Sequence, residues 1–161
     1  MTAALTGLTG LDTYFEDFTI GEVTEHARGK TVTEMDNVLL TNLVLNTAQG
    51  HFNEHRMAET PFGHRITFGG ITAAMIIGLA SQDTSENSLQ ELGVDSIRFL
   101  APVLHGDTVY AFSEVIDIVD EGREDAGIVV FRHYGVNHKD EVVFDGQRRV
   151  LIKKRRWWAE R

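Results

Sequence analysis

The stretch LNTAQGHFNEH, residues 45–55, places several amide and imidazole side chains directly after an apolar run. Asn46 precedes His51 by five residues, and the other polar candidates beside them are Gln49, Asn53 and Glu54. Imidazole takes up and returns a proton near neutral pH, while an amide can orient a water molecule or a neighbouring ring. The stretch is therefore a candidate for acid–base chemistry, for a metal site or for a polar loop with no chemical role.

The metal alternative depends on the spacing of the histidines. On a helix, His51 and His55 would share a face because they are four residues apart, with Glu54 between them and His64 nearby. The zinc motif H-E-x-x-H instead places its glutamate directly after the first histidine, and no third ligand is assured here. We therefore expect no metal. The remaining histidines are expected to be structural or at the surface: His26, His105, His133 and His138.

The composition narrows the class of protein. A chain of 161 residues with 42% hydrophobic and 24% charged residues fits one globular domain. Its net charge of -9 disfavours nucleic-acid binding, which requires a clustered basic surface. The basic terminal segment KKRRWWAER is expected to solvate a strand end or to contact a partner subunit. Because cysteine is absent, disulfides, thiolate nucleophiles and cysteine-ligated metals are excluded.

The apolar patterning argues against a membrane protein. The longest apolar stretch, ITAAMIIGLA, is about half of the ~20 residues that a helix needs to cross a bilayer. The N-terminus lacks the charged-then-apolar pattern of a signal peptide. We expect a cytoplasmic protein without membrane contact, with a flexible leader over residues 1–13, one domain over residues 14–156 and a C-terminal tail over residues 157–161.

Two segments have the pattern of helices. Thr33 and Asp36 form a capping pair for a helix over residues 34–47, which would end at Gly50. Its apolar face would consist of Val38, Leu39, Leu43 and Leu45. The second helix, ITAAMIIGLASQ, is apolar on nearly every side, which predicts a helix buried all round.

Strand patterns surround these helices. GEVTEHARGKTVT predicts a first strand with a turn or bulge at Gly29. Four strands are then expected within residues 92–103, 107–121, 126–138 and 141–155, and the short turns between them predict an antiparallel meander. Helices followed by strands favour an α+β fold, in which one curved sheet wraps around the central apolar helix.

Four segments of the chain, in order, resemble a known family. They are YFEDFTIGEV, TVTEMDNVLLTNLVLNTAQGHFN, ITFGGITAAMIIGLASQDTS and LGVDSIRFLAPVLHGDTVYAFSEV, and within the last of them lies the run FxxPVxxGDT. Over roughly residues 14–153 the chain resembles the MaoC-like enoyl-CoA hydratases of the hot-dog fold. The resemblance implies that fold, a homodimer or dimer of dimers with active sites near the subunit interface, and no cofactor beyond the CoA of the substrate.

The resemblance also assigns site residues. The family's hydratase signature is an aspartate followed five residues later by a histidine, and Asn46 and His51 occupy these two places. NTAQGHFN is nearer to the N-T-Q-P-L-H-F-D of the branch that includes mesaconyl-CoA and itaconyl-CoA hydratases, although it departs from that form at Ala48, Gln49, Gly50 and Asn53. Phe68 and Gly69 align with the family's His-Gly at the start of the central helix.

Hydration of a 2-enoyl thioester needs a base for the water, a proton for the α-carbon and donors for the enolate oxygen. His51 is expected to move the proton, alone or with Glu54, while Asn46 orients the water or the imidazole. The oxyanion donor is expected at Gly69 or Gly70, because a helix N-terminus presents free N–H groups. Further candidates are Gln49 and Asn53 as donors, and Arg65 or Arg98 for a distal carboxylate or a CoA phosphate.

The family resemblance implies (R)-specific hydration of a 2-enoyl-CoA, or dehydration of the 3-hydroxyacyl-CoA. Resemblance to the mesaconyl-CoA and itaconyl-CoA branch implies a small branched or dicarboxylic acyl group, although the sequence itself does not fix it. Two alternatives stay open: a non-catalytic hot-dog subunit that binds acyl chains or an active partner, and an acyl-CoA thioesterase on the same fold. The asparagine at position 46 favours the non-catalytic subunit, because it cannot carry a proton.

Overall fold

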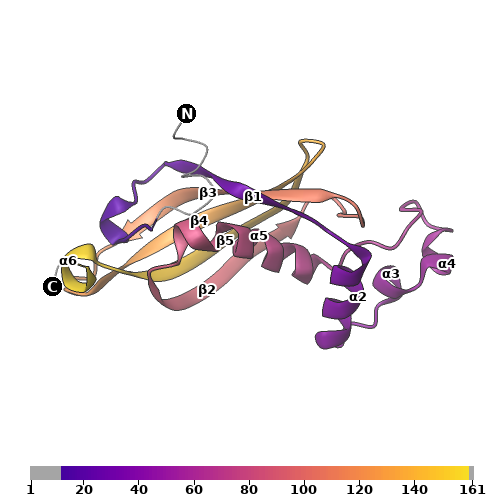
Figure 1. Ribbon diagram of the computed structural model, residues 1–161, viewed down its shortest axis with the longest axis horizontal. Coiled ribbons are helices and arrows are strands. Elements are labelled where there is room, and N and C mark those ends of the chain that lie inside the picture. The colour runs from indigo at the N-terminus through magenta and orange to yellow at the C-terminus, as the bar shows by residue number, and fades with distance from the viewer. Residues whose placement is uncertain (1–11, 160–161) are drawn as a thin grey trace.

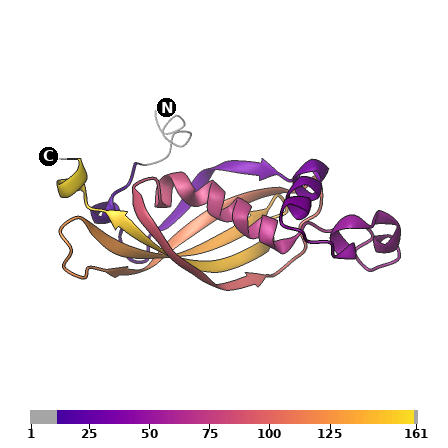
Figure 2. The same ribbon diagram turned by 90° about the horizontal axis from the view of Figure 1, so that it is seen from below.

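The computed structural model describes residues 12–159, whose strands form one antiparallel sheet. The five strands lie in the order β1-β3-β4-β5-β2. Their bounds are Val23–Thr31 for β1, Ser88–Phe99 for β2, Thr108–Val119 for β3, Ala126–Asn137 for β4 and Val142–Lys153 for β5. The sheet curves around one long helix, α5, which spans Gly69–Thr84 (Figures 1 and 2). The predicted α+β class, with a sheet wrapped around a central helix, is confirmed.

The short helices gather at the two ends of this sheet (Figure 1). At one end lie α2 (Glu34–Leu43), α3 (Gln49–Phe52) and α4 (Glu54–Met57), which together project beyond the sheet. At the other end lie the 3-10 helix η1 (Phe15–Asp17) and α6 (Arg155–Trp158). The residues of the predicted catalytic stretch therefore lie in the projecting end, next to the N-terminus of α5.

The core lies between α5 and the sheet. The buried residues of α5 are Ile71, Thr72, Ala73, Ile76, Ala80 and Thr84. Ile76 is fully buried, and a Cβ atom at Gly135 of β4 would lie 2.7 Å from it, so glycine there allows the helix to contact the strand backbone. The prediction that the helix is buried all round is wrong, because the sheet covers one side and leaves Ala74 and Gly78 exposed.

Helix α2 differs from the prediction in its length and in its buried face. Its N-terminus is the predicted capping box, in which the Thr33 hydroxyl accepts from the backbone N–H of Asp36 at 3.2 Å. The helix ends at Leu43, and the backbone turns at Leu45 with φ +57°. Its buried residues are Asn37 and Thr41, whereas the predicted apolar face is largely exposed: Leu39 52%, Leu43 68% and Leu45 84%. The polar face points inward because the Asn37 side chain hydrogen-bonds the backbone of His51 and Phe68.

Strand β2 also departs from the prediction. The strands β3, β4 and β5 form a meander, but β2 pairs with β5 at the edge of the sheet rather than with β3. Both edges of β3 are occupied, by β1 and β4, so β5 offers the open edge to β2. In β1 the predicted irregularity at Gly29 is confirmed by a register shift between Glu25 and Gly29.

The helices η1 and α6 contact each other, because the Arg155 N–H donates to the Glu16 carboxylate at 2.9 Å. Residues 1–11 of the predicted leader and 160–161 of the predicted tail lie outside the described residues. Asn87 donates hydrogen bonds to the Asp12 carboxylate at 2.9 Å and to the Thr13 carbonyl at 3.1 Å. Trp158 donates from its indole to the Asp125 carbonyl at 3.0 Å.

Within residues 12–159, none of the helices combines the length and the apolar character that crossing a membrane requires.

Candidate active site

His51 lies in the short helix α3 with its imidazole held by a backbone carbonyl. Its Nδ1 atom is 2.9 Å from the carbonyl oxygen of Ile66. A carbonyl oxygen can only accept, so Nδ1 carries the proton and the lone pair of the neutral ring lies on Nε2. The ring also packs against Phe68, with 5.5 Å between centroids. Nε2 has no hydrogen-bond partner among the described residues and is therefore the atom available for proton transfer.

The N-terminus of α5 provides free amides beside this imidazole. The N–H groups of Ile71 and Thr72 both donate to the Phe68 carbonyl, at 2.9 and 3.2 Å. Those of Gly69 and Gly70 have no acceptor among the described residues. Together with the positive end of the helix dipole, these two amides form a candidate oxyanion hole.

Space explains why glycine occupies both of these positions. A Cβ atom at Gly69 would lie 2.9 Å from the ring of Phe99, and one at Gly70 would lie 2.6 Å from the ring of Phe68. Real Cβ atoms essentially never show such short contacts, so a side chain at either position would displace an aromatic ring. The glycines therefore let two phenylalanine rings lie directly on the backbone of the first helical turn.

An apolar pocket of about 330 Å³ opens beside Gly69. The pocket is bounded by Phe62, Phe99, Leu100 and Val103 among others, and Thr67 and Thr72 provide its side-chain hydroxyls. Thr67 is held to a second lining residue, because its N–H donates to the Val103 carbonyl at 2.8 Å. The pocket is large enough for a small acyl chain whose carbonyl group lies at the Gly69 amide.

Asn37 lies in the candidate site, although no motif in the sequence points to it. Its side chain is completely buried, its Nδ2 donates to the His51 carbonyl at 3.1 Å, and its Oδ1 accepts from the Phe68 N–H at 3.1 Å. One signal could have identified it: Asn37 and Thr41 are four residues apart and so share one helix face, with the apolar residues 38–40 between them.

Asn46 lies in the turn between α2 and α3. Its Oδ1 accepts from the backbone N–H of Ala48 at 3.1 Å, and its own N–H donates to the Thr41 carbonyl at 2.9 Å. The side chain thus shapes the turn that precedes α3, and the structure shows no hydrogen bond between Asn46 and His51. The Nδ2 group of this amide has no partner among the described residues and is left for a water molecule.

The two further amides of the catalytic stretch hydrogen-bond to each other. Asn53 donates from Nδ2 to Oε1 of Gln49 at 2.7 Å, and its Oδ1 accepts from the Arg56 N–H at 3.1 Å. Asn53 is the N-cap residue of α4. Both side chains therefore stabilise the α3–α4 segment, and their role as donors to a substrate stays a prediction.

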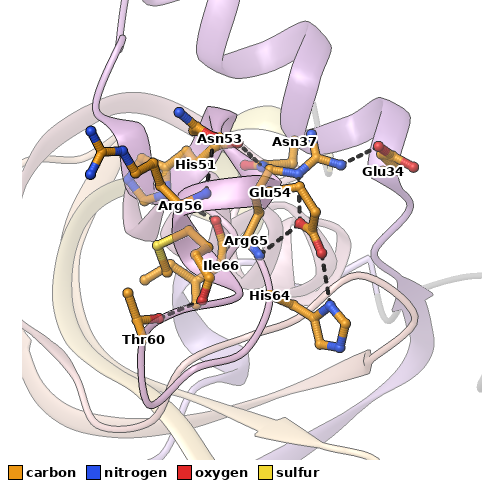
Figure 3. Close-up of polar contacts among 11 residues, drawn as sticks. Glu34, Asn37, His51, Asn53, Glu54, Arg56, Thr60, His64, Arg65 and Ile66 are labelled. Atoms are coloured by element: carbon orange, nitrogen blue, oxygen red, sulfur yellow. Dashed lines mark hydrogen bonds and ion pairs between the residues drawn. The ribbon is translucent and has the colours of Figure 1, made fainter.

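Glu54 and Arg65 form an ion-pair cluster beside the site (Figure 3). The Nε atom of Arg65 lies 3.0 Å from Oε2 of Glu54, and its Nη2 atom pairs with Glu34. The hydrogen bond from His64, at 2.8 Å, and those from Arg65 lower the pKa of Glu54 to about 2. Glu54 is therefore ionised at neutral pH and holds no proton to donate to a substrate.

The predicted arginines already have carboxylate partners. The Arg65 side chain is only 14% exposed and contacts both glutamates, so little of its charge is available to a substrate carboxylate. Arg98 pairs with Asp145, which also accepts two hydrogen bonds from Arg132, at 3.0 and 2.9 Å. Among the described residues, no three His, Asp or Glu side chains are grouped to hold a metal ion.

A second polar cluster lies near the other end of α5. The Asp83 carboxylate is 2.6 Å from Nδ1 of His26, whose Nε2 is 2.6 Å from the Ser113 hydroxyl. The same hydroxyl is 2.7 Å from Nδ1 of His133. Ser113 and both histidines are at most 2% exposed, so this chain of hydrogen bonds is part of the core. Sequence spacing gave no signal for it, because its members come from α5 and three strands.

The fold and the site define a class of protein. A helix wrapped by an antiparallel sheet is the hot-dog fold, which solved structures similar to this chain share. The chain belongs to the MaoC-like mesaconyl-CoA hydratase family: a family model described as "Mesaconyl-CoA hydratase" matches residues 23–154. The resemblance seen in the sequence is confirmed.

Individual relatives agree with this family. The mesaconyl-CoA hydratase of Haloarcula marismortui is 34% identical over 155 residues, which cover 88% of this chain and 42% of the relative. The (R)-specific enoyl-CoA hydratase of Rhodospirillum rubrum is 31% identical over 142 residues, covering 88% of this chain and 93% of the relative. A solved MaoC domain protein from Chloroflexus aurantiacus has a TM-score of 0.84 at 29% identity, covering 91% of this chain and 46% of that chain. This chain thus spans less than half the length of the mesaconyl-CoA hydratases that it matches.

Proposed function

We propose that the chain catalyses (R)-specific hydration of a 2-enoyl-CoA and, in reverse, dehydration of the 3-hydroxyacyl-CoA. The observation that carries the proposal is the fixed orientation of His51, whose Nδ1 binds the Ile66 carbonyl and whose Nε2 is left for proton transfer. The family, and relatives named as hydratases and dehydratases of CoA esters, support this reaction class. The name of the Rhodospirillum rubrum relative supports the (R) configuration.

In the proposed reaction, Nε2 of His51 removes a proton from water while the water oxygen forms a bond to the β-carbon. The electron pair of the double bond moves to the thioester oxygen, and the amide of Gly69 or Gly70 donates to the resulting enolate. The α-carbon then takes the proton from the imidazolium, so one water molecule has been added and His51 is neutral again. The Nδ2 group of Asn46 would orient the attacking water.

The acyl group is proposed to be small, with crotonyl-, mesaconyl- and itaconyl-CoA as candidates. The pocket beside Gly69 is apolar and holds about 330 Å³. If the thioester carbonyl binds the Gly69 amide, the acyl chain extends toward the aromatic ring of Phe99. A pocket of this volume favours a short chain over a long fatty acyl chain.

We also propose that the chain assembles through β2, as a homodimer or dimer of dimers. Within the described chain β2 pairs only with β5, so its second edge is open. A row of large apolar side chains is 38–53% exposed on and just after this strand: Leu89, Leu92, Val94, Ile97, Phe99 and Leu100. An open edge with exposed apolar side chains favours a partner. Light scattering coupled to size-exclusion chromatography tests this, and a monomer at assay concentration would contradict it.

The reaction is tested by incubating the purified chain with a panel of enoyl-CoAs and recording mass spectra. We expect a product heavier by one water molecule, and we expect His51→Ala to lower kcat by about 10²-fold or more, the range of general acid–base catalysis. Assay of free CoA thiol in the same samples distinguishes the thioesterase alternative. Wild-type rates of hydration in His51→Ala would contradict the proposal.

Asn46 supports one competing function, that of a non-catalytic hot-dog subunit. Its Oδ1 is used by the Ala48 N–H and its amide cannot carry a proton. A chain that turns over no enoyl-CoA but co-purifies with a hydratase-active homologue would support this competitor. Turnover by the isolated chain would exclude it.

A further inference from the structure

Asn37 connects the two parts of the site that the proposed reaction uses. It lies on α2, three positions after the first helical residue, Glu34, and is 0% exposed. Its Nδ2 donates to the backbone carbonyl of His51, and its Oδ1 accepts from the backbone N–H of Phe68 (Figure 3 shows the first of these contacts). One amide group thus links α3, which carries the imidazole, to Phe68, the N-cap residue of α5.

Both contacts of Asn37 are strongly specified. A buried amide group that loses a hydrogen-bond partner lowers the free energy of unfolding by about 1–3 kcal/mol. The Asn37 side chain is therefore held between two backbone groups that match its donor and its acceptor. The helix that carries it is also fixed, by the capping box at its N-terminus and by the Thr41 hydroxyl, which donates to the Asn37 carbonyl at 2.5 Å. Asn37 is therefore a rigid reference point for its neighbours.

Backbone contacts close a ring around this point. The Ile66 carbonyl accepts from the His51 imidazole, and the Ile66 N–H donates to the Gly50 carbonyl at 3.1 Å. Residues 66–68 therefore contact α3 through Ile66 and contact α2 through Phe68. Because Gly69 follows Phe68 directly, a change at Asn37 shifts the oxyanion donors relative to Nε2 of His51.

We propose that Asn37 is a positioning residue, which sets the distance between the proton carrier His51 and the amides at Gly69 and Gly70. The inference rests on the proposed hydration reaction. Asn37 itself does not touch the reacting atoms, so its removal should lower kcat and leave KM nearly unchanged. A misplacement of about 1 Å can cost about 10²-fold in rate.

Asn37→Asp is the variant that tests this role most directly. It keeps an oxygen for the Phe68 N–H but places a second oxygen against the His51 carbonyl, where a carboxylate would repel it. A protonated carboxyl group can donate there instead, and burial together with this hydrogen bond raises the pKa of such a group. We therefore expect kcat about 10²-fold below wild type near pH 8, and a variant-to-wild-type ratio that rises as the pH falls.

Neighbouring charges do not reverse this expectation. The ionisable groups around position 37 are His51 on α3 and the ion-pair cluster of Arg65, Glu54 and Glu34 (Figure 3). His51 is present in both proteins, so the wild type measured over the same pH range is the reference for the variant. The charge of Arg65 is compensated by its two glutamate partners.

Asn42→Asp is the matched control. Asn42 lies on the same helix, makes the same kind of side-chain donation, to the Val38 carbonyl at 2.8 Å, and is exposed. The same chemical change there should alter kcat by less than about threefold, as expected for a surface substitution. Circular dichroism and thermal melting establish that each variant is folded. If Asn37→Asp does not fold, Asn37→Ala is assayed, with the same loss of kcat expected but no recovery at low pH.

A second readout does not depend on turnover. In protein with 15N-labelled histidine, the ring nitrogen signals of His51 should shift in Asn37→Asp and stay in place in Asn42→Asp. An active wild type whose Asn37 variants keep its kcat and its His51 signals would overturn the role of Asn37 alone. A folded wild type that hydrates no enoyl-CoA would overturn the proposed function, and the role of Asn37 with it.

Discussion

The Nδ1 atom of His51 donates to the carbonyl oxygen of Ile66 over 2.9 Å, and this single contact fixes which nitrogen of the ring can do chemistry. In the neutral ring Nε2 must be the base, and after it takes a proton both nitrogens are donors. Glu54 is ionised and paired with His64 and Arg65, so it offers no second proton. In the proposed hydration, His51 is thus left to remove the proton from water and to return one to the α-carbon.

The first prediction concerns the stereochemistry of addition. A single imidazole beside the substrate delivers the hydroxyl group and the α-proton to the same face of the double bond. Hydration of crotonyl-CoA in D2O should therefore give the syn product with one deuterium at the α-carbon, which NMR coupling constants identify. Anti addition would require a second proton carrier on the opposite face and would contradict the assignment of both steps to His51.

The second prediction compares two glycines of α5. In Gly69→Ala the new Cβ would lie 2.9 Å from the Phe99 ring, so the ring must move in the acyl pocket. We expect KM to rise about tenfold and the free energy of unfolding to fall by about 1–3 kcal/mol. Gly78→Ala meets no heavy atom within 4 Å, so it should stabilise the helix by about 1 kcal/mol and leave KM unchanged. Steady-state kinetics and urea unfolding measure both effects, and an unchanged KM in Gly69→Ala would contradict the placement of the acyl pocket.

The third prediction concerns Arg65 and the distal carboxylate of a dicarboxylic substrate. Because Arg65 is already paired with Glu34 and Glu54, Arg65→Gln should change the ratio of kcat/KM for mesaconyl-CoA over crotonyl-CoA by less than about threefold. Arg98→Gln is the comparison, since its side chain is 61% exposed. A loss of about tenfold specific to mesaconyl-CoA in Arg65→Gln would show that Arg65 leaves its glutamates to bind the substrate.

Local signals in the sequence predicted most of the elements. The capping pair Thr33 and Asp36, the turn residues between strands and the apolar run after Gly70 all act within a few residues, so they define where elements begin and end. The position of β2 depends instead on which strand edge is open, and that is a property of the whole sheet. Sequence order alone therefore placed β2 next to β3 rather than next to β5.

The candidate site was predictable only where the proposed chemistry belongs to a type of side chain. His51 stands out because imidazole is a proton carrier, and Gly69 because a helix begins there. Asn37 does not stand out in the sequence, because the role proposed for it depends on hydrogen bonds to the backbone of His51 and Phe68, which are 14 and 31 residues away. The apolar period of α2 likewise identified a helix but not its buried face. Asn37 and Thr41 are the buried residues because their side chains hydrogen-bond backbone groups there, whereas Leu39 and Leu43 are exposed.

The last prediction concerns acid stability and the buried His133. Burial, with the nearby charges of Arg148 and His26, lowers the pKa of His133 to about 3, against 6.5 for a free imidazole. Its Nδ1 bonds to Ser113 and its Nε2 is buried without a partner among residues 12–159, so the folded protein keeps the ring neutral. The unfolded chain takes up a proton below about pH 6.5 and the folded chain does not. The free energy of unfolding therefore falls as the pH drops from about 6.5 toward 3, and this loss is absent above that window.

His133→Gln removes this titration and separates it from the carboxylates that also respond to acid. Between pH 6.5 and 4.5 the wild type should lose about 2 kcal/mol more of its free energy of unfolding than His133→Gln does, because one extra proton binds the unfolded chain. The exposed His55 on α4 provides the control, and His55→Gln should follow the wild-type curve. Urea unfolding at both pH values measures the difference. If His133→Gln lost as much stability as the wild type, the folded protein would protonate His133, and the chain from Asp83 through His26 and Ser113 would have to rearrange to admit that charge.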